Sequence, residues 1–347
     1  MLSSLWSRCK NASIAALLLG VFATPALATF ERGLVAYERG DFDAALKIWR
    51  RAAKSGHPGA QHNLAVMYDH GRGVPVDDAK AVHWYTRAAN SGHAPSQYTL
   101  GLLHSRGQGV EKSMREAVKW YTKAADQGHV ESQFVLGVLY DFGKGVRKSE
   151  RKAVSWYKRA ATQGDARAQY NLALMYDFGQ GGIKDITKAI KWYRRAAEQG
   201  NAKAQYMLGI AYLKGEGVAQ SNPQAYAWIT LAAASGHVRA RQYRVRPWKR
   251  MNAAERKQGK KLARELRAEV RLRRSLSLER TDRAALPTFE LVRDTQRVLA
   301  QKGLLKGAVD GILGPKTRAG IRALQEKMRL PQTGEPTMEL LLLADPD

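Results

Sequence analysis

Apolar and small residues recur along this chain with a fixed period of 36 positions. A Leu stands at each of five equivalent places, always three residues after a Gln, at 64, 100, 136, 172 and 208. After Leu64, apolar residues follow at Met67 and Tyr68, the i, i+3, i+4 spacing of an amphipathic helix. Self-similarity at such a period is the mark of a repeat array.

Each period also contains a second apolar segment. Gly-x-Gly pairs at 71/73, 107/109, 143/145, 179/181 and 215/217 interrupt the first helix. The second segment carries a Trp (84, 120, 156, 192, 228), then an Ala pair, and closes on a Gly. We therefore predict helix–turn–helix hairpins that are apolar on two faces and stable only when stacked, an all-α solenoid.

Three features inside the repeats have both a functional and a structural interpretation. The Gly-x-Gly pairs lack the third Gly of a nucleotide-binding loop, so we expect structural turns. Four His residues follow the closing Gly at equivalent places of different repeats, too far apart to share a metal, and we expect them at helix starts: His57, His93, His129 and His237. The Trp-Tyr stripe could stack on sugars, but its helical spacing favours a place in the core.

The frame resembles the Sel1-like repeat, a relative of the tetratricopeptide repeat. The stretch Phe134-Val-Leu-Gly-Val-Leu-Tyr-Asp-Phe-Gly-Lys-Gly-Val146 matches the repeat's Leu-Gly-x-x-Tyr-x-x-Gly-x-Gly-Val pattern. Five copies cover 61–240, and 30–60 resembles a shorter tetratricopeptide-type hairpin that would form an N-terminal cap. The resemblance implies a protein-interaction solenoid.

The segment 241–285 follows the repeats and is predicted to be a basic capping helix and linker. Asn252 and Glu255 have the spacing of a capping box, and Leu262, Leu266 and Val270 form an i+4 apolar stripe that could seal the end of the array.

Charge gives this segment a second interpretation. The chain has 57 Lys and Arg against 31 Asp and Glu, a net charge of +26, and residues 239–283 alone hold 17 basic and five acidic residues. The segment is either a solvated linker helix or a docking strip for an anionic lipid, a wall polymer or an acidic protein. The candidate contacts are Arg264, Arg267, Arg271, Arg273 and Arg274.

The first 28 residues have the pattern of a secretory signal peptide. Arg8 and Lys10 precede an uncharged stretch over 14–23, and Ala26-Leu-Ala28 forms an Ala-x-Ala site. We expect cleavage after Ala28 and a periplasmic protein, although an uncleaved anchor remains open. Export makes nucleic acid an unexpected partner despite the basic charge.

A different module begins near residue 286. Gln296, Leu299 and Gly303 precede Asp310-Gly-Ile-Leu-Gly314-Pro-Lys-Thr317, and Pro315 is expected to start a helix. This frame resembles the peptidoglycan-binding domain 1 family over 286–347. The resemblance implies a small three-helix domain that docks on cell-wall glycan or stem peptide. The candidate contacts are Asp310, Gly311, Gly314, Lys316 and Thr317, although the glycines could simply shape the turn while Thr317 packs.

The residues argue against catalysis. Cys9, the only cysteine, lies in the predicted signal peptide, so no nucleophilic Cys is expected in the mature chain. Residues 238–347 contain no His for a zinc hydrolase, and we expect no metal or cofactor. We predict a wall-tethered adaptor whose module binds peptidoglycan and whose solenoid groove recruits envelope proteins, with possible peripheral contact to anionic membrane. The alternatives are a sensor that regulates wall enzymes in response to muropeptide or an envelope partner, and an undetected peptidoglycan hydrolase.

Overall fold

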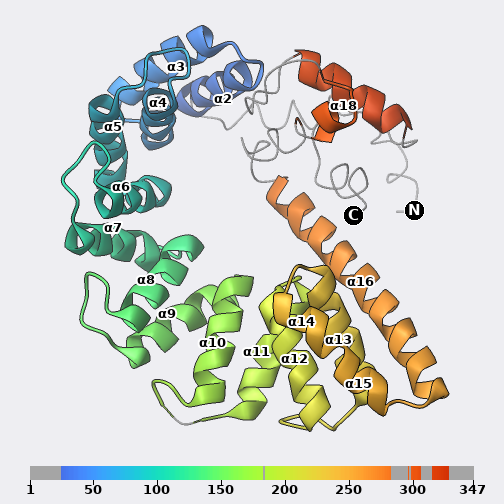
Figure 1. Cartoon of the computed structure of the whole chain (residues 1–347). Coiled ribbons are helices and arrows are strands. Elements are labelled where there is room, and N and C mark those ends of the chain that lie inside the picture. The colour runs from blue at the N-terminus through green and yellow to red at the C-terminus, as the bar shows by residue number, and fades with distance from the viewer. Residues whose placement is uncertain (1–24, 183, 283–295, 297, 306–314, 328–347) are drawn as a thin grey trace, which may run out of the picture. The chain divides into compact units, whose positions relative to one another are not determined.

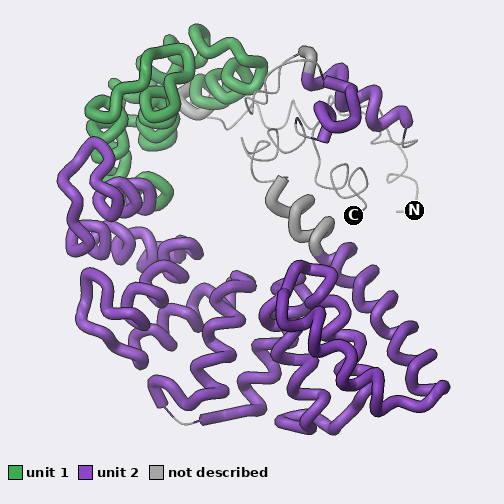
Figure 2. Tube along the Cα trace, in the orientation of Figure 1, with its two compact units in different colours: residues 1–96 green, residues 97–347 purple. Residues whose placement is uncertain are grey.

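The computed structural model describes residues 25–182, 184–282, 296, 298–305 and 315–327. The regular elements in these ranges are α-helices (Figure 1). The helices belong to two compact units, residues 1–96 and 97–347, which are coloured green and purple in Figure 2. The prediction of an all-α solenoid built from helical hairpins is confirmed.

The first unit contains two hairpins. The helices α2 (Pro25–Glu38) and α3 (Phe42–Lys54) pair, and α4 (Pro58–His70) pairs with α5 (Asp78–Asn90). The hairpin α2–α3 occupies the place of the expected N-terminal cap. The expected cleavage point after Ala28 falls in the first turns of α2, and the rest of the predicted signal peptide, 1–24, lies outside the described residues.

The second unit contains the later repeats. The helix α6 (Ala94–Arg106) begins at the end of the first unit. The later helices are α7 (Met114–Asp126), α8 (Val130–Phe142), α9 (Glu150–Thr162), α10 (Ala166–Phe178), α11 (Ile186–Glu198), α12 (Ala202–Lys214), α13 (Asn222–Ala234), α14 (Val238–Tyr243), α15 (Val245–Arg250), α16 (Ala253–Asp282) and α18 (Pro315–Lys327). Even-numbered helices from α4 to α12 are the first helix of a hairpin, and odd-numbered helices are the second.

The Gly-x-Gly pairs are structural turns, as predicted. Gly143 ends α8 in the left-handed region at φ 69°, and its N–H bonds the carbonyl of Leu139. Gly145, at φ 71°, lies so close to α7 that a Cβ there would come within 2.8 Å of the carbonyl oxygen of Met114. A side chain would therefore be opposed both by the backbone conformation and by the preceding repeat.

The core of the array is made by Tyr and Ala of the second helices, together with Leu of the first. The Ala pairs are at most 2% exposed in the four repeats from α5 to α11, and Tyr85, Tyr121, Tyr157 and Tyr193 are equally buried. The Trp residues before these tyrosines are less uniform than predicted. Trp192 is buried, as is Trp228 before Ile229, whereas Trp84, Trp120 and Trp156 are only partly buried. A Lys or Arg lies over each of these three rings and over that of Trp192. The expectation that the whole stripe fills the core is therefore wrong for these three.

The four equivalent His residues lie at helix starts, as predicted. The Nδ1 atoms of His57, His129 and His237 accept the backbone N–H three residues ahead, at 3.1, 3.3 and 3.2 Å. His93 accepts from Ser96 in the same way, at 3.3 Å. A neutral imidazole here takes the place of the usual Ser or Asp cap.

The buried glutamines tie each hairpin to its neighbour. Gln169 donates to the carbonyl of Ala161 at 3.1 Å and accepts from the amide of Gln199 at 2.7 Å. Gln133 repeats both contacts, with Ala125 and Gln163. A polar side chain can be tolerated in this core because its hydrogen bonds are made on both ends.

The long helix α16 closes the last hairpin by packing on α13. The predicted capping box forms, with reciprocal 2.9 Å bonds between Asn252 and Glu255. Val270 is buried and Leu266 packs beside it in the same core cluster as Trp228 of α13. The apolar stripe of α16 therefore packs against the last hairpin, as its i+4 spacing predicted.

Candidate functional site

A row of aromatic residues follows the buried glutamines on the first helices of the second unit. Tyr98, Phe134, Tyr170 and Tyr206 stand 36 residues apart, each partly buried. Each faces the second residue of the next first helix or of α14. That position is Glu131 for Tyr98 and becomes basic further along the array, as Arg167, Lys203 and Arg239. The row therefore changes from acidic to basic towards its C-terminal end.

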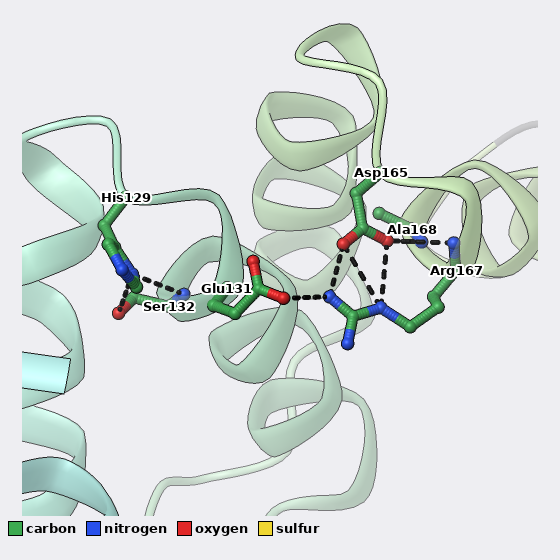
Figure 3. A network of polar contacts seen from close by, with 6 residues as sticks. All are labelled: His129, Glu131, Ser132, Asp165, Arg167 and Ala168. Carbon is green, nitrogen blue, oxygen red and sulfur yellow. Dashed lines mark hydrogen bonds and ion pairs between the residues drawn. The ribbon is translucent and has the colours of Figure 1, made fainter. Parts of the chain in front are cut away.

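The first cation of the row is neutralised. The guanidinium of Arg167 lies over Phe134, 4.4 Å from the ring centroid, and bonds two carboxylates (Figure 3). It donates to Glu131 at 2.8 Å and to Asp165 at 2.5 Å. Asp165 also caps α10 by accepting the N–H of Ala168 at 2.8 Å. These bonds raise the pKa of Arg167 and leave its charge balanced within the protein.

Two cavities lie on either side of Tyr206, where the row ends. One, of about 540 Å³, runs from Tyr170 to α14; the other, of about 560 Å³, runs from Tyr206 along α12 to α15. They share the lining residues Tyr206 and Met207, so they are adjacent, and together they are called the Tyr206 groove. Ile210 and Leu213 give the second cavity an apolar wall.

The cations of the Tyr206 groove differ from Arg167. Apart from Lys214, its exposed basic residues are Lys203, Arg239, Arg246 and Arg250, and none of these four has a carboxylate partner among the described residues. Arg246 lies over Tyr243, 4.1 Å from the ring centroid. The one lining acid, Glu216, is paired with Lys214 at 3.3 Å.

The titratable groups of the groove respond to this charge. The ring of His237 stacks on Tyr206 with centroids 4.4 Å apart. Burial lowers the pKa of His237, and Arg239 and Lys203 lower it further. Burial raises the pKa of Tyr206, while Arg239 acts in the opposite direction. His237 is thus held neutral beside uncompensated positive charge, an environment suited to an anionic ligand.

The predicted basic contacts on α16 are at the surface. Arg264, Arg267 and Arg271 are exposed at spacings of three and four, hence on one face, and make no ion pair with any described residue. Arg273 is different, because its guanidinium bonds Glu198 of α11 at 3.0 Å and Glu269 at 2.8 Å, which ties α16 to the array. The side chain of Arg274 lies outside the described part of the chain.

The predicted wall contacts are described only in part. Asp310, Gly311 and Gly314 lie outside the described residues, as does the side chain of Lys316. Thr317, in the first turn of α18, is 4% exposed and accepts a hydrogen bond from the amide of Gln296 at 3.1 Å. Its hydroxyl therefore packs inside the module, and α18 begins at Pro315 as expected.

The described residues contain no group of three or more His, Cys, Asp and Glu placed to hold a metal ion. Ser149 and Lys152 have the Ser-x-x-Lys spacing of some acyl-transfer enzymes, but Ser149 Oγ accepts the Lys152 N–H at 3.4 Å as the cap of α9. None of the described helices is both long enough and apolar enough to span a bilayer.

Together these features define a helical-repeat interaction protein with an open groove and a separate C-terminal module. The Sel1 repeat family model matches six segments, 14–57, 58–93, 94–129, 130–165, 166–201 and 202–237. The chain belongs to the Sel1 repeat family. The first segment includes the hairpin compared above with a tetratricopeptide, so the family model counts six repeats where the 36-residue spacing indicated five. Residues 290–342 match the model described as "Putative peptidoglycan binding domain".

Two solved structures are similar to this chain. A Sel1 repeat protein from Oxalobacter formigenes is 36% identical, with a TM-score of 0.58, and the match covers 61% of this chain and 87% of that one. The protective antigen c5321 of uropathogenic Escherichia coli, which has an SLR fold, is 29% identical with a TM-score of 0.49, over 87% of this chain and 68% of that one.

One curated relative matches a short stretch. It is the "Putative OxPP cycle protein OpcA" of Nostoc punctiforme, 45% identical over 60 residues, or 16% of this chain. The match spans only 13% of that relative's length.

Sequence reasoning missed the Tyr206 groove. The signal was available, because the residue after each repeat Gln is aromatic in four consecutive repeats and the facing residue becomes basic. The 36-residue period identified the Leu, Gly and Ala positions that all repeats share, but it does not single out the position after the Gln, whose residue varies. Variable positions at fixed places in a repeat are where binding surfaces differ.

Proposed function

We propose that this protein is an exported, non-enzymatic adaptor that binds peptidoglycan through its C-terminal module and recruits envelope proteins through its solenoid. The observation that carries the proposal is the combination in one chain of a peptidoglycan-binding domain match and a Sel1 array with an open, unneutralised groove. The signal-peptide pattern supports a periplasmic location, where peptidoglycan is accessible.

The basic face of α16 adds a second contribution to wall attachment. Exposed cations attract an anionic surface without selecting its chemistry, and salt screens the attraction because the Debye length is about 8 Å at 0.15 M. We propose that the module confers specificity and that Arg264, Arg267 and Arg271 prolong residence near the wall.

Co-sedimentation with purified sacculi tests the proposal. The full chain is compared with a chain lacking 286–347 and with the triple variant Arg264→Glu/Arg267→Glu/Arg271→Glu, between 20 and 500 mM NaCl. We expect the deletion to abolish pelleting at every salt concentration above the lowest, and the triple variant to retain salt-insensitive pelleting with a several-fold lower affinity at low salt. Salt-insensitive pelleting of the deleted chain would contradict the proposal and make the solenoid the wall binder.

A further inference from the structure

We propose that the Tyr206 groove binds an extended, acidic segment of a partner protein. The inference rests on the proposed adaptor function, because it specifies the chemistry by which the solenoid recruits. It concerns a different part of the molecule from the wall-binding module, so the two can fail separately.

Charge complementarity is the first argument. Lys203 and Arg239 flank one side of Tyr206, and Arg246 and Arg250 flank the other, all exposed and without a carboxylate among the described residues. Glu216 already bonds Lys214 and offsets none of them. Four cations around two adjacent cavities attract a ligand that brings several carboxylates along its length.

The lining between the cations is the second argument. Tyr206 stacks on His237 and meets Tyr243 edge-on, with centroids 4.4 and 5.7 Å apart. Met207 and Ile210 continue the apolar surface of α12. In an extended chain successive side chains point to opposite sides, so alternating acidic and apolar residues could place carboxylates on the cations and apolar groups on this surface.

The preceding repeat supplies an internal comparison. At Arg167 the protein's own Glu131 and Asp165 already occupy the position where a ligand carboxylate would bind (Figure 3). This shows how carboxylates satisfy a cation in this place. Lys203 and Arg239 occupy the corresponding positions one and two repeats later without such partners, which confines the proposed site to the C-terminal end of the row.

Fluorescence anisotropy with a defined probe tests the inference. The probe is a fluorescein-labelled octapeptide of alternating Glu and Leu, and the comparison peptide has Lys in place of Glu. The full chain is measured beside the double variant Lys203→Glu/Arg239→Glu. The control double variant, Arg115→Glu/Lys158→Glu, makes the same charge change at exposed residues of α7 and α9, outside the groove. Circular dichroism checks that each variant retains its helices.

We expect the acidic octapeptide to bind the full chain. Its affinity for the groove variant, Lys203→Glu/Arg239→Glu, should be at least tenfold lower, and its affinity for the control double variant should change less than threefold. The lysine peptide should not bind. Equal losses in the two double variants would overturn the inference, because they would indicate attraction to the net charge of the chain. Binding of inorganic polyphosphate with no binding of the acidic peptide would overturn it as well.

Sacculus pelleting separates this inference from the proposed function. The groove variant should pellet with sacculi as the full chain does, because its module is unchanged. If the groove is the recruiting site, the groove variant should lose peptide binding and still pellet with sacculi. Failure of the full chain to pellet would contradict wall attachment while leaving the peptide result standing.

Discussion

The glutamine bridge between hairpins gives a prediction whose size follows from the structure. In Gln169→Leu, a side chain of similar volume replaces one that is 4% exposed and makes two hydrogen bonds, to Ala161 and from Gln199. The carbonyl of Ala161 keeps a second donor, the N–H of Gly164 at 3.1 Å, and the amide of Gln199 is exposed and can be rehydrated. Neither partner is left as a buried orphan, so the cost is that of the bonds alone.

Each intramolecular hydrogen bond contributes about 1 kcal/mol, so the two bonds predict a destabilisation of about 2 kcal/mol for Gln169→Leu. Gln61 provides a matched control within the chain. It makes the equivalent bond to Ala53 at 3.1 Å, but its Oε1 has no partner, because residue 91 is Ser and its hydroxyl bonds the carbonyl of Arg87. Gln61→Leu should therefore cost about 1 kcal/mol.

The assay is urea unfolding followed by far-ultraviolet circular dichroism, with a double-mutant cycle for each pair. The cycle of Gln169→Leu with Gln199→Ala should give a coupling free energy of about 1 kcal/mol, whereas the cycle of Gln61→Leu with Ser91→Ala should give a coupling near zero. Because repeat arrays can unfold in steps, hydrogen exchange should show that the loss of protection is centred on α9 to α11. Equal couplings in the two cycles would refute the hydrogen bond between Gln169 and Gln199 as a stabilising contact.

Three further predictions concern single positions. Burial lowers the pKa of His62 from 6.5 to about 3, so the unfolded state takes up a proton at a higher pH than the folded state does. The contribution of neutral His62 to stability should therefore be fully present above pH 6.5, and between pH 6.5 and pH 3 the free energy of unfolding should fall by up to about 1.4 kcal/mol per pH unit. In His62→Phe the urea midpoint should depend less on pH, and a steeper dependence would contradict the assignment. Gly181→Ala should cost more than about 2 kcal/mol of stability, because the φ of Gly181 is 72° and a Cβ there would lie 2.8 Å from a carbonyl oxygen of α9. A Cβ at Gly182 would have no atom within 4 Å, so Gly182→Ala should change thermal stability little. Similar melting temperatures for the two variants would refute the close approach at Gly181. Tyr157→Ala should lower the free energy of unfolding, measured by chemical denaturation, by about 3–5 kcal/mol. Trp156→Ala should lower it clearly less, since Tyr157 is 0% exposed and Trp156 is only partly buried. A larger loss in Trp156→Ala would contradict the assignment of Tyr157 to the core.

The periodic parts of the fold could be predicted because identical neighbours impose identical requirements. Every hairpin needs a left-handed residue after its first helix and small residues where helices meet, so the Gly and Ala positions recur and identify the turns. The Trp positions could not be assigned correctly, because period alone places both Trp84 and Tyr85 on an apolar face. Which of them enters the core depends on how neighbouring hairpins pack.

The candidate sites were less predictable for a related reason. Arg271 and Arg273 are both arginines of the same basic segment, so the sequence does not distinguish them. Only the packing of α16 on the array brings Arg273 to Glu198. Thr317 lies in the expected motif, yet its hydroxyl bonds Gln296, 21 residues away. The unneutralised charge at Lys203 and Arg239, in contrast to Arg167, depends on contacts between repeats that spacing does not encode.

We expect one molecule to engage the wall and an acidic partner segment at the same time. Sacculi are mixed with the fluorescein-labelled Glu–Leu octapeptide and with the full chain, the chain lacking 286–347, or Lys203→Glu/Arg239→Glu, and the fluorescence that pellets is measured. We expect the peptide to pellet only with the full chain, because each variant lacks one of the two attachments. Peptide that pellets equally with either variant, or that stays in the supernatant while the full chain pellets and binds it in solution, would contradict the account.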